Sequence, residues 1–182
     1  MKILFIAETL TYGGAARRFV DLANALVNRS HTVTLLLYND FIQINNIIDC
    51  RINVIIDNIE NNNRNWLYRN IFYRYKCIEL IDKYVKMINC DIVISFNDMV
   101  NINVLLSKEA AKKKRVISER SDPYYNKRYL QFIKKIIFKR ADGIVFQTKG
   151  AMEFFGDKLK NKYKIIPNPI PSNIQVCRLT DN

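Results

Sequence analysis

The chain has 182 residues, of which 49% are hydrophobic and 25% charged, and its formal net charge is +12. These proportions indicate a globular protein and exclude a long disordered chain. A chain of this length buries roughly 70% of its unfolded surface, which suffices for one core. The excess of positive charge indicates an anionic partner, such as nucleic acid, a membrane surface or a phosphorylated substrate.

Short apolar runs alternate with longer helical patterns along the whole chain. We predict strands at Lys2–Ala7, Thr32–Tyr38, Ile52–Ile56, Asp91–Phe96, Arg115–Ser118, Gly143–Gln147 and Tyr163–Pro167. We predict helices between them at Ala15–Asn28, 64–87, Asp98–Lys112, Tyr124–Arg140 and Lys149–Phe155. Most of the strands are apolar without alternation, as strands covered on both faces are. The fold class is therefore α/β, a doubly wound, Rossmann-like parallel sheet that binds ligands at the carboxyl ends of its strands.

Residues 1–166 form one domain in this prediction, and residues 167–182 form a linker or tail. Pro167, Pro169 and Pro171 exclude helix and central strand from that point on. At the other end, the apolar run stops at Glu8, which is too short for a signal peptide. The four cysteines form no Cys-x-x-Cys pattern, so we expect reduced thiols in a cytoplasmic protein and no metal site.

A glycine pair follows the first predicted strand and opens the first helix. The segment Tyr12-Gly13-Gly14-Ala15 leaves backbone N–H groups unpaired at a helix N-terminus, where the dipole favours an anion. Glycine also lets a phosphate approach the backbone without meeting a Cβ atom. We therefore predict a phosphate at Gly13 and Gly14, although such a pair can also be only a turn. The dinucleotide fingerprint Gly-x-Gly-x-x-Gly is absent from the chain.

Two further polar loops follow predicted strands and should reach the same sheet edge. Charged groups in them suit phosphate, and carboxylates and amides suit sugar hydroxyls. Besides the glycine loop, the candidate binding residues are Tyr12, Arg17, Ser95, Asn97, Asp98, Glu119 and Arg120. Each also has a structural interpretation: Asp98 can cap a helix, Asp122-Pro123 can start one, and Arg17 and Arg18 can be solvated.

The predicted helix over residues 64–87 mixes six basic residues with aromatic ones. Its core-facing stripe is predicted to be Leu67, Ile71, Tyr75, Ile78, Val85 and Ile88. The remaining basic and aromatic face suits the headgroup layer of an anionic membrane. A solvated helix is the alternative. No motif of a nucleic-acid-binding protein accompanies the charge, so nucleic acid is not expected as a partner.

In sequence order, several motifs resemble the N-terminal domain of a family 4 glycosyltransferase with the GT-B fold. They are Gly13-Gly14-Ala15-Ala16-Arg17, Leu22-Ala23-Asn24-Ala25-Leu26, Ile94-Ser95-Phe96, Ser118-Glu119-Arg120-Ser121-Asp122-Pro123 and Pro167-Asn168-Pro169-Ile170. The resemblance implies transfer of a hexose from a nucleotide-sugar donor to a glycan acceptor with retention of configuration. It implies no metal and no cofactor beyond the nucleotide sugar as co-substrate.

The resemblance also implies roles for single residues. Gly13, Gly14 and Ala15 would contact the donor diphosphate, and the other candidates would contact the acceptor. Many relatives have a histidine where Arg120 stands. Because arginine keeps its proton, Arg120 would be a catalytic residue that stabilises charge on a phosphate or leaving group. The acidic residue that usually follows Gly-Gly-Ala is Ala16 here.

Family members continue with a donor-binding domain beyond the Asn-Pro-Ile linker. We therefore expect this chain to be a truncated product, one subunit of a split enzyme with a separate donor-binding subunit, or a non-catalytic module that binds membranes or a partner. The basic and aromatic surface suits a lipid-linked acceptor in surface polysaccharide synthesis. The expected location is the cytoplasm, peripheral at the inner face of the membrane.

Overall fold

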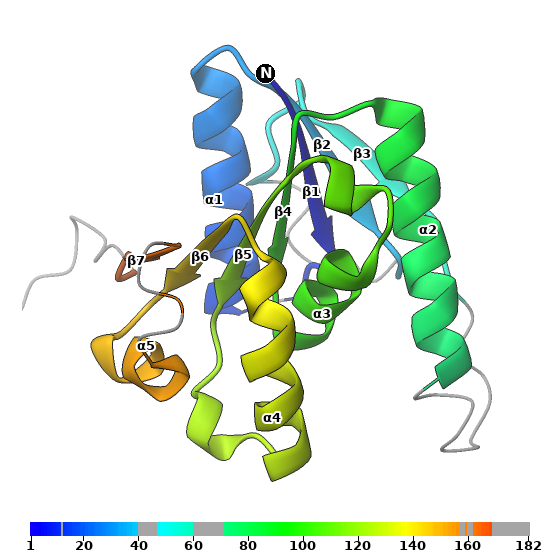
Figure 1. Ribbon diagram of the computed structural model, residues 1–182. Coiled ribbons are helices and arrows are strands. Elements are labelled where there is room, and N and C mark those ends of the chain that lie inside the picture. The colour runs from blue at the N-terminus through cyan, green and yellow to red at the C-terminus, as the bar shows by residue number, and fades with distance from the viewer. Residues whose placement is uncertain (12, 40–46, 60–70, 157–158, 160–161, 169–182) are drawn as a thin grey trace, which may run out of the picture.

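A seven-stranded parallel sheet forms the centre of the computed structural model (Figure 1). The structure describes residues 1–168 apart from 12, 40–46, 60–70, 157–158 and 160–161. The strands are β1 (Lys2–Ala7), β2 (Thr32–Leu37), β3 (Asn53–Ile56), β4 (Ile92–Phe96), β5 (Lys114–Glu119), β6 (Gly143–Phe146) and β7 (Tyr163–Ile165). All seven predicted strands are confirmed, with ends that differ by at most two residues.

The strands follow the order β3-β2-β1-β4-β5-β6-β7, and every neighbouring pair is parallel. In the centre, Ile3 of β1 is in register with Val33 of β2 on one side and Ile92 of β4 on the other. The order reverses between β1 and β4, which confirms the doubly wound α/β class.

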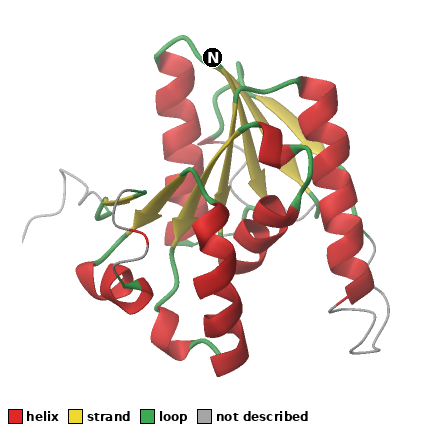
Figure 2. Cartoon of the chain, viewed as in Figure 1, coloured by secondary structure: helices red, strands yellow, loops and turns green. Residues whose placement is uncertain are grey.

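Helices connect the strands and cover the sheet (Figure 2). They are α1 (Gly14–Asn28), α2 (Tyr73–Ile88), α3 (Asp98–Leu106), α4 (Arg128–Ile137) and α5 (Lys149–Phe155), with 3-10 turns at η3 (Ala110–Lys112), η4 (Pro123–Tyr125) and η5 (Phe138–Arg140). The predicted helix Tyr124–Arg140 is thus interrupted near its start and ends in a 3-10 turn. No helix in the described ranges is long and apolar enough to cross a membrane.

The two faces of the sheet have different covers. On one face, α1 packs Phe19, Val20 and Ala23 against β1, β2 and β4. On the other face, α2 and α3 cover the β1–β4 half of the sheet. Beyond them, η5 and α5 cover β5 and β6, where Phe138 and Phe155 stack with ring centroids 5.1 Å apart.

The predicted core stripe of α2 is wrong in part. Ile71 and Tyr75 are 54% and 60% exposed, and Leu67 lies outside the described residues. The buried residues of α2 are Cys77, Ile81, Tyr84 and Val85, of which only Val85 was predicted. The predicted stripe and the observed stripe both consist mainly of apolar or aromatic residues, so helical periodicity does not distinguish them. Packing against the sheet buries the stripe that contains Cys77 and Ile81.

Candidate functional site

The reversal of strand order opens a crevice at the carboxyl ends of β1 and β4. The helix after β1 lies on one face of the sheet and the helix after β4 lies on the other, so the two connecting loops diverge. In such sheets ligands bind at this point. Gly13 and Gly14 stand on one side of the crevice, and Asn97, with a φ of 78°, stands on the other.

The glycine loop leaves room for a ligand. Gly13 and Gly14 are exposed, and a Cβ atom built on either would meet no atom within 4 Å. The first turn of α1 has no acidic residue and no side chain that caps its N–H groups. The amide of Arg17 already donates to the carbonyl of Gly13 at 3.1 Å, so the free amides belong to the residues before it. This arrangement suits a phosphate. Tyr12 lies outside the described residues.

Arg120 is held by an aromatic ring and an amide. Its guanidinium lies 4.7 Å from the ring centroid of Phe96, and Nη1 donates to Oδ1 of Asn168 at 2.9 Å. Gln147 donates to the same oxygen at 3.1 Å. Nε of Arg120 is buried without a partner among the described residues. Burial, together with the charge of Arg18, lowers the pKa of Arg120, but a guanidinium stays protonated, and its remaining donors suit an anion.

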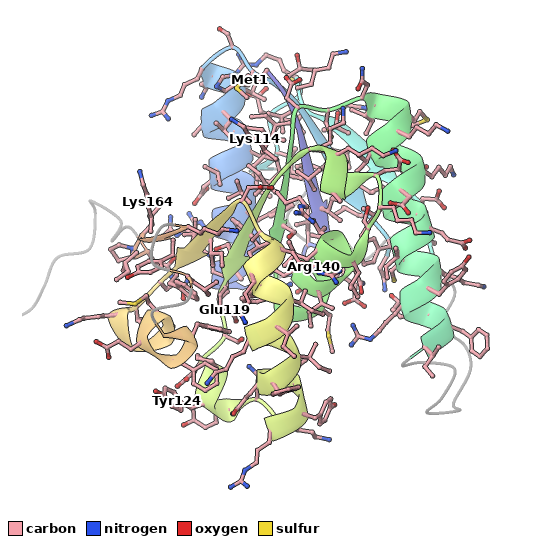
Figure 3. The ribbon with its side chains drawn as sticks, viewed as in Figure 1. Met1, Lys114, Glu119, Tyr124, Arg140 and Lys164 are labelled. Atoms are coloured by element: carbon pink, nitrogen blue, oxygen red, sulfur yellow. The ribbon has the colours of Figure 1, made fainter. Side chains whose placement is uncertain are left out.

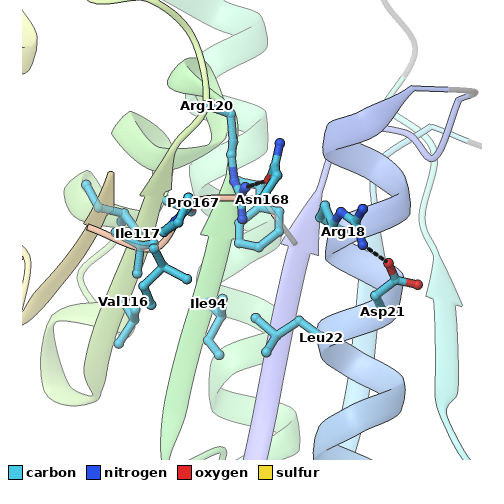
Figure 4. Close-up of a pocket in the computed structure, with 13 residues that line it drawn as sticks. Arg18, Asp21, Leu22, Ile94, Val116, Ile117, Arg120, Pro167 and Asn168 are labelled. Carbon is cyan, nitrogen blue, oxygen red and sulfur yellow. Dashed lines mark hydrogen bonds and ion pairs between the residues drawn. The ribbon is translucent and has the colours of Figure 1, made fainter. Parts of the chain in front are cut away.

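Two cavities meet at Arg120. An apolar one of about 300 Å³ lies between α1 and β5, where Leu22, Ile94 and Val116 face Pro167 (Figure 4). Arg18 lines this cavity and pairs with Asp21 at 2.9 Å. A second cavity of about 340 Å³ also has Arg120 in its lining, together with polar residues that include Asp122, Gln147 and Thr148. Arg120 therefore lines both an apolar cavity and one that contains several polar side chains.

A buried ionic cluster lies directly behind Arg120. Nζ of Lys134, on α4, is 2.9 Å from Oδ1 of Asp98 and 3.0 Å from Oε2 of Glu119. The side chains of Lys134 and Glu119 are both 0% exposed. Ser121 donates to Oε1 of Glu119 at 2.6 Å and lies 2.9 Å from Asp98. Figure 3 shows Glu119 between the sheet and α4. The cluster therefore holds the residues before and after Arg120 to α3 and α4.

The pKa values of the two carboxyl groups in the cluster are shifted in opposite directions. Burial, followed by the hydrogen bond and negative charge of Asp98, raises the pKa of Glu119 to about 8. Burial acts in the same sense on Asp98, but its hydrogen bonds with Glu119 and Lys134 outweigh it, so the pKa of Asp98 is lowered. Two close carboxylates with one ammonium group favour a state in which Glu119 holds a proton.

A buried amide joins the same strands. Asn101 of α3 accepts from the hydroxyl of Ser95 at 2.8 Å and donates to the carbonyl of Ser118 at 3.0 Å. Ser95 and Asn101 are 0% exposed. This bridge holds the ends of β4 and β5 at a set distance, so the loops that carry Asn97 and Arg120 have a rigid base.

The predicted site residues thus divide into two groups. Gly13, Gly14, Arg17, Asn97 and part of Arg120 are open to solvent, whereas Ser95, Glu119 and most of Asp98 are buried in hydrogen-bonded networks. Asp122 accepts from the amide of Tyr124 at 3.0 Å and has proline after it, so its helix-start interpretation is confirmed. Asp98 opens α3, but its carboxylate contacts Lys134 and Ser121 and caps nothing.

Sequence reasoning missed Lys134 and Asn101. Lys134 follows Leu130 and precedes Phe138 at helical spacing of four, so a charge interrupts the inward stripe of α4. That interruption is the signal that could have found it. No group of three His, Cys, Asp or Glu side chains in the described ranges is placed to hold a metal.

The fold and the crevice define the class: a doubly wound, Rossmann-like α/β domain with a ligand crevice at its switch point. The sequence profile of glycosyltransferase family 4 matches residues 12–173. The chain therefore belongs to glycosyltransferase family 4, of whose GT-B fold it forms the N-terminal region.

Three relatives illustrate the match. The chain is 29% identical over 173 residues to the GalNAc-α-(1→4)-GalNAc-α-(1→3)-diNAcBac-PP-undecaprenol α-1,4-N-acetyl-D-galactosaminyltransferase of Campylobacter jejuni, covering 93% of this chain and 46% of that protein. The lipopolysaccharide outer core galactosyltransferase WaaB is 17% identical, with a TM-score of 0.68, and 93% of this chain covers 46% of it. Anabaena HepE, solved with UDP and glucose, is 16% identical, with a TM-score of 0.65, and 93% of this chain covers 45% of it. The chain thus spans about half the length of these relatives.

Proposed function

We propose that this chain is the acceptor-side domain of a retaining glycosyltransferase that moves a hexose from a nucleotide sugar to a lipid-linked glycan for surface polysaccharide. The observation that carries the proposal is Arg120, a cation with spare donors that lines the same cavity as Arg18 of α1. The glycine loop at the switch point supports the same function, because both features favour phosphate.

Each part of the site has a role in this proposal. The amides at Gly13, Gly14 and Ala15 approach the donor diphosphate, and Arg120 stabilises the charge that develops on the leaving phosphate. Tyr12, Arg17, Ser95, Asn97, Asp98 and Glu119 form the acceptor side. Because Ser95 and Glu119 are buried, they act by holding the loops of Asn97 and Arg120 in place. The donor's nucleotide and sugar are bound by a second domain, in the same polypeptide or in a separate subunit.

An anionic membrane is the proposed partner surface, on the cytoplasmic side. We propose that α4, rather than the predicted helix over residues 64–87, makes the contact with the membrane. Tyr84 is one of the aromatic residues of the predicted helix over 64–87 that we expected on its exposed face. It is instead buried and donates to Asp57 at 2.9 Å. On η4 and α4, the large side chains that are at least 37% exposed are Tyr124, Tyr125, Tyr129, Phe132, Ile133 and Ile136. We call this set, with exposed Lys127, Arg128, Lys135, Lys139 and Arg140, the α4 surface.

The α4 surface has the composition of an interfacial helix. In α4 the buried side chain is Lys134, whereas most of the apolar side chains of the helix are exposed to solvent. Apolar groups of such a helix enter the boundary between headgroups and acyl chains, while each Lys or Arg near an anionic surface contributes about 1 kcal/mol. Tyr124 and the start of α4 lie at the carboxyl edge of the sheet, as the candidate site does, whereas Met1 and Lys114 mark the opposite edge (Figure 3). Docking there would place the site next to a lipid-linked acceptor.

Transfer of labelled sugar tests the proposal. The chain, alone and together with a donor-binding half, is incubated with a panel of nucleotide sugars and a bacterial lipid-linked glycan fraction. We expect transfer only with the donor half, and loss of at least about 100-fold in rate for Arg120→Ala, as for other removed charge-stabilising donors. Gly14→Trp should abolish transfer without unfolding, because the space around Gly14 is open. Lys86→Ala, at the far end of α2, is the control, and equal rates in all three variants would contradict the site.

A further inference from the structure

A third cavity, of about 650 Å³, lies between α2, α3 and α4, on the face of the sheet opposite α1. We call it the α2–α4 groove. Its lining is apolar except for one residue, and consists of Ile102, Leu106, Tyr129, Leu130, Ile133, Ile137 and Arg74. A cavity of this size and polarity accommodates a small apolar ligand or a segment of a longer one.

Arg74 places a positive charge in this apolar lining. Its Nη2 donates to Sδ of Met99 at 2.7 Å, and a thioether is a weak acceptor. No carboxylate in the described part of the chain forms an ion pair with Arg74. The guanidinium is half-buried and keeps donors for an anion. The groove therefore combines an apolar wall with a cation that has no carboxylate partner among the described residues.

Arg74 lies at the end of the groove nearest the candidate site. It is in the first turn of α2, and the neighbouring Tyr73 donates to Glu8, just beyond the carboxyl end of β1, at 3.3 Å. Its partner Met99 is in the first turn of α3, next to Asp98. At the other side, Tyr129 and Ile133 belong both to the groove and to the exposed α4 surface. The groove thus runs from the proposed membrane-facing helix toward the sheet edge.

We propose that the α2–α4 groove seats the first isoprene units of a polyprenyl diphosphate acceptor, with its diphosphate at Arg74. This inference rests on the proposed function and specifies where the lipid part of the acceptor binds. An apolar chain that ends in a diphosphate satisfies both the lining and the cation, since a guanidinium binds phosphate oxygens through two parallel donors. A soluble glycan would leave the apolar wall bare, and a second copy of a chain with a net charge of +12 would bring more like charge.

Calorimetric titration of the purified chain with farnesyl diphosphate, a soluble isoprenoid diphosphate, tests the groove. We expect affinity to rise from geranyl to farnesyl diphosphate, and farnesol and inorganic diphosphate each to bind at least about tenfold more weakly than farnesyl diphosphate. Arg74→Ala should lower the affinity for farnesyl diphosphate by about tenfold or more. Leu106→Trp should also lower this affinity, because the larger side chain fills the groove. Leu106 is 37% exposed, so a larger side chain fits there without disturbing the core. Lys76→Ala and Met87→Trp, both at exposed positions of α2 that do not line the groove, are the matched controls.

Several results would overturn the inference. If Leu106→Trp bound farnesyl diphosphate as well as the parent chain does, the ligand would bind elsewhere. If farnesol bound as tightly as farnesyl diphosphate, Arg74 would have no role in binding the diphosphate. Tighter binding of lysophosphatidylglycerol than of farnesyl diphosphate would assign the groove to membrane phospholipid. The transfer assay separates the two proposals: full transfer to lipid-linked glycan by Leu106→Trp would contradict the groove alone. Groove-dependent binding without transfer in the presence of a donor half would contradict the proposed function alone.

Discussion

Lys134 of α4 and Glu119 at the end of β5 form an ion pair of 3.0 Å in which neither side chain has any exposed surface. The pair joins the helix of the proposed membrane surface to the strand that carries Arg120. Since Glu119 directly precedes Arg120, any movement of α4 that displaces Lys134 also acts on the loop of the candidate catalytic residue.

Removal of the ammonium group should strongly destabilise the fold. Lys134→Met leaves Asp98 and Glu119 close together without their cation, and breaking a buried pair in this way costs about 3–5 kcal/mol in free energy of unfolding. Urea denaturation followed by circular dichroism measures the change. The double variant Lys134→Met/Glu119→Gln should regain part of the loss, because glutamine replaces a buried carboxyl group that must otherwise stay protonated beside Asp98. Lys139→Met, on the exposed side of the same segment, should change stability by less than about 0.5 kcal/mol.

Stability should fall as pH rises from about 4.5 to about 8. The pKa of Glu119 is raised to about 8 in the folded chain, from its usual value of 4.5, so in this window the folded state holds a proton that the unfolded state has released. The contribution is complete below pH 4.5 and is lost as pH passes through 8. The lowered pKa of Asp98 acts below pH 4, outside this window. Urea midpoints of the parent and of Glu119→Gln, compared across pH 5 to 8.5, isolate the effect; parallel curves would contradict it.

The Ser95–Asn101 hydrogen bond should be coupled energetically. Asn101→Ala leaves the hydroxyl of Ser95 and the carbonyl of Ser118 without this buried partner, which costs about 1–3 kcal/mol. Ser95→Ala, Asn101→Ala and the double variant form a thermodynamic cycle measured by urea denaturation. We expect a coupling energy of at least about 0.5 kcal/mol. Strict additivity would show that the two side chains contribute independently and that the bridge does not hold β4 to β5.

Binding to anionic vesicles should depend on the α4 surface. Arg128→Glu with Lys139→Glu should reduce flotation with phosphatidylglycerol vesicles by more than about fivefold per residue, since each cation near the surface contributes about 1 kcal/mol and reversal adds repulsion. Phe132→Ser should also reduce it, and high salt should weaken the remaining binding. Lys86→Glu with Lys112→Glu changes the net charge equally at the opposite edge and should retain flotation. An equal loss in both pairs would show that only total charge matters.

Local sequence accounts for most of the architecture. Each strand was predictable because a parallel strand covered on both faces is a continuous apolar run, as in Leu35-Leu36-Leu37. The glycine loop was predictable because a glycine pair between an apolar run and a helical pattern is typical of a strand-to-helix turn. The inward stripe of α2 was not predictable, since two stripes of this helix have the hydrophobicity that a core requires.

The sequence by itself determined the α/β class, the edge of the sheet that carries the polar loops and the position of Arg120 among them, because these follow from apolar runs and turn residues close together in the chain. Only the tertiary structure decided that Lys134 meets Asp98 and Glu119, that Arg74 stands in an apolar groove, and that the apolar side of α4 faces outward. These features depend on side chains from different elements that pack against one another. Whether a charged side chain is solvated or belongs to a site depends on the charge and the burial of its neighbours. Periodicity within one helix carries no information about those neighbours.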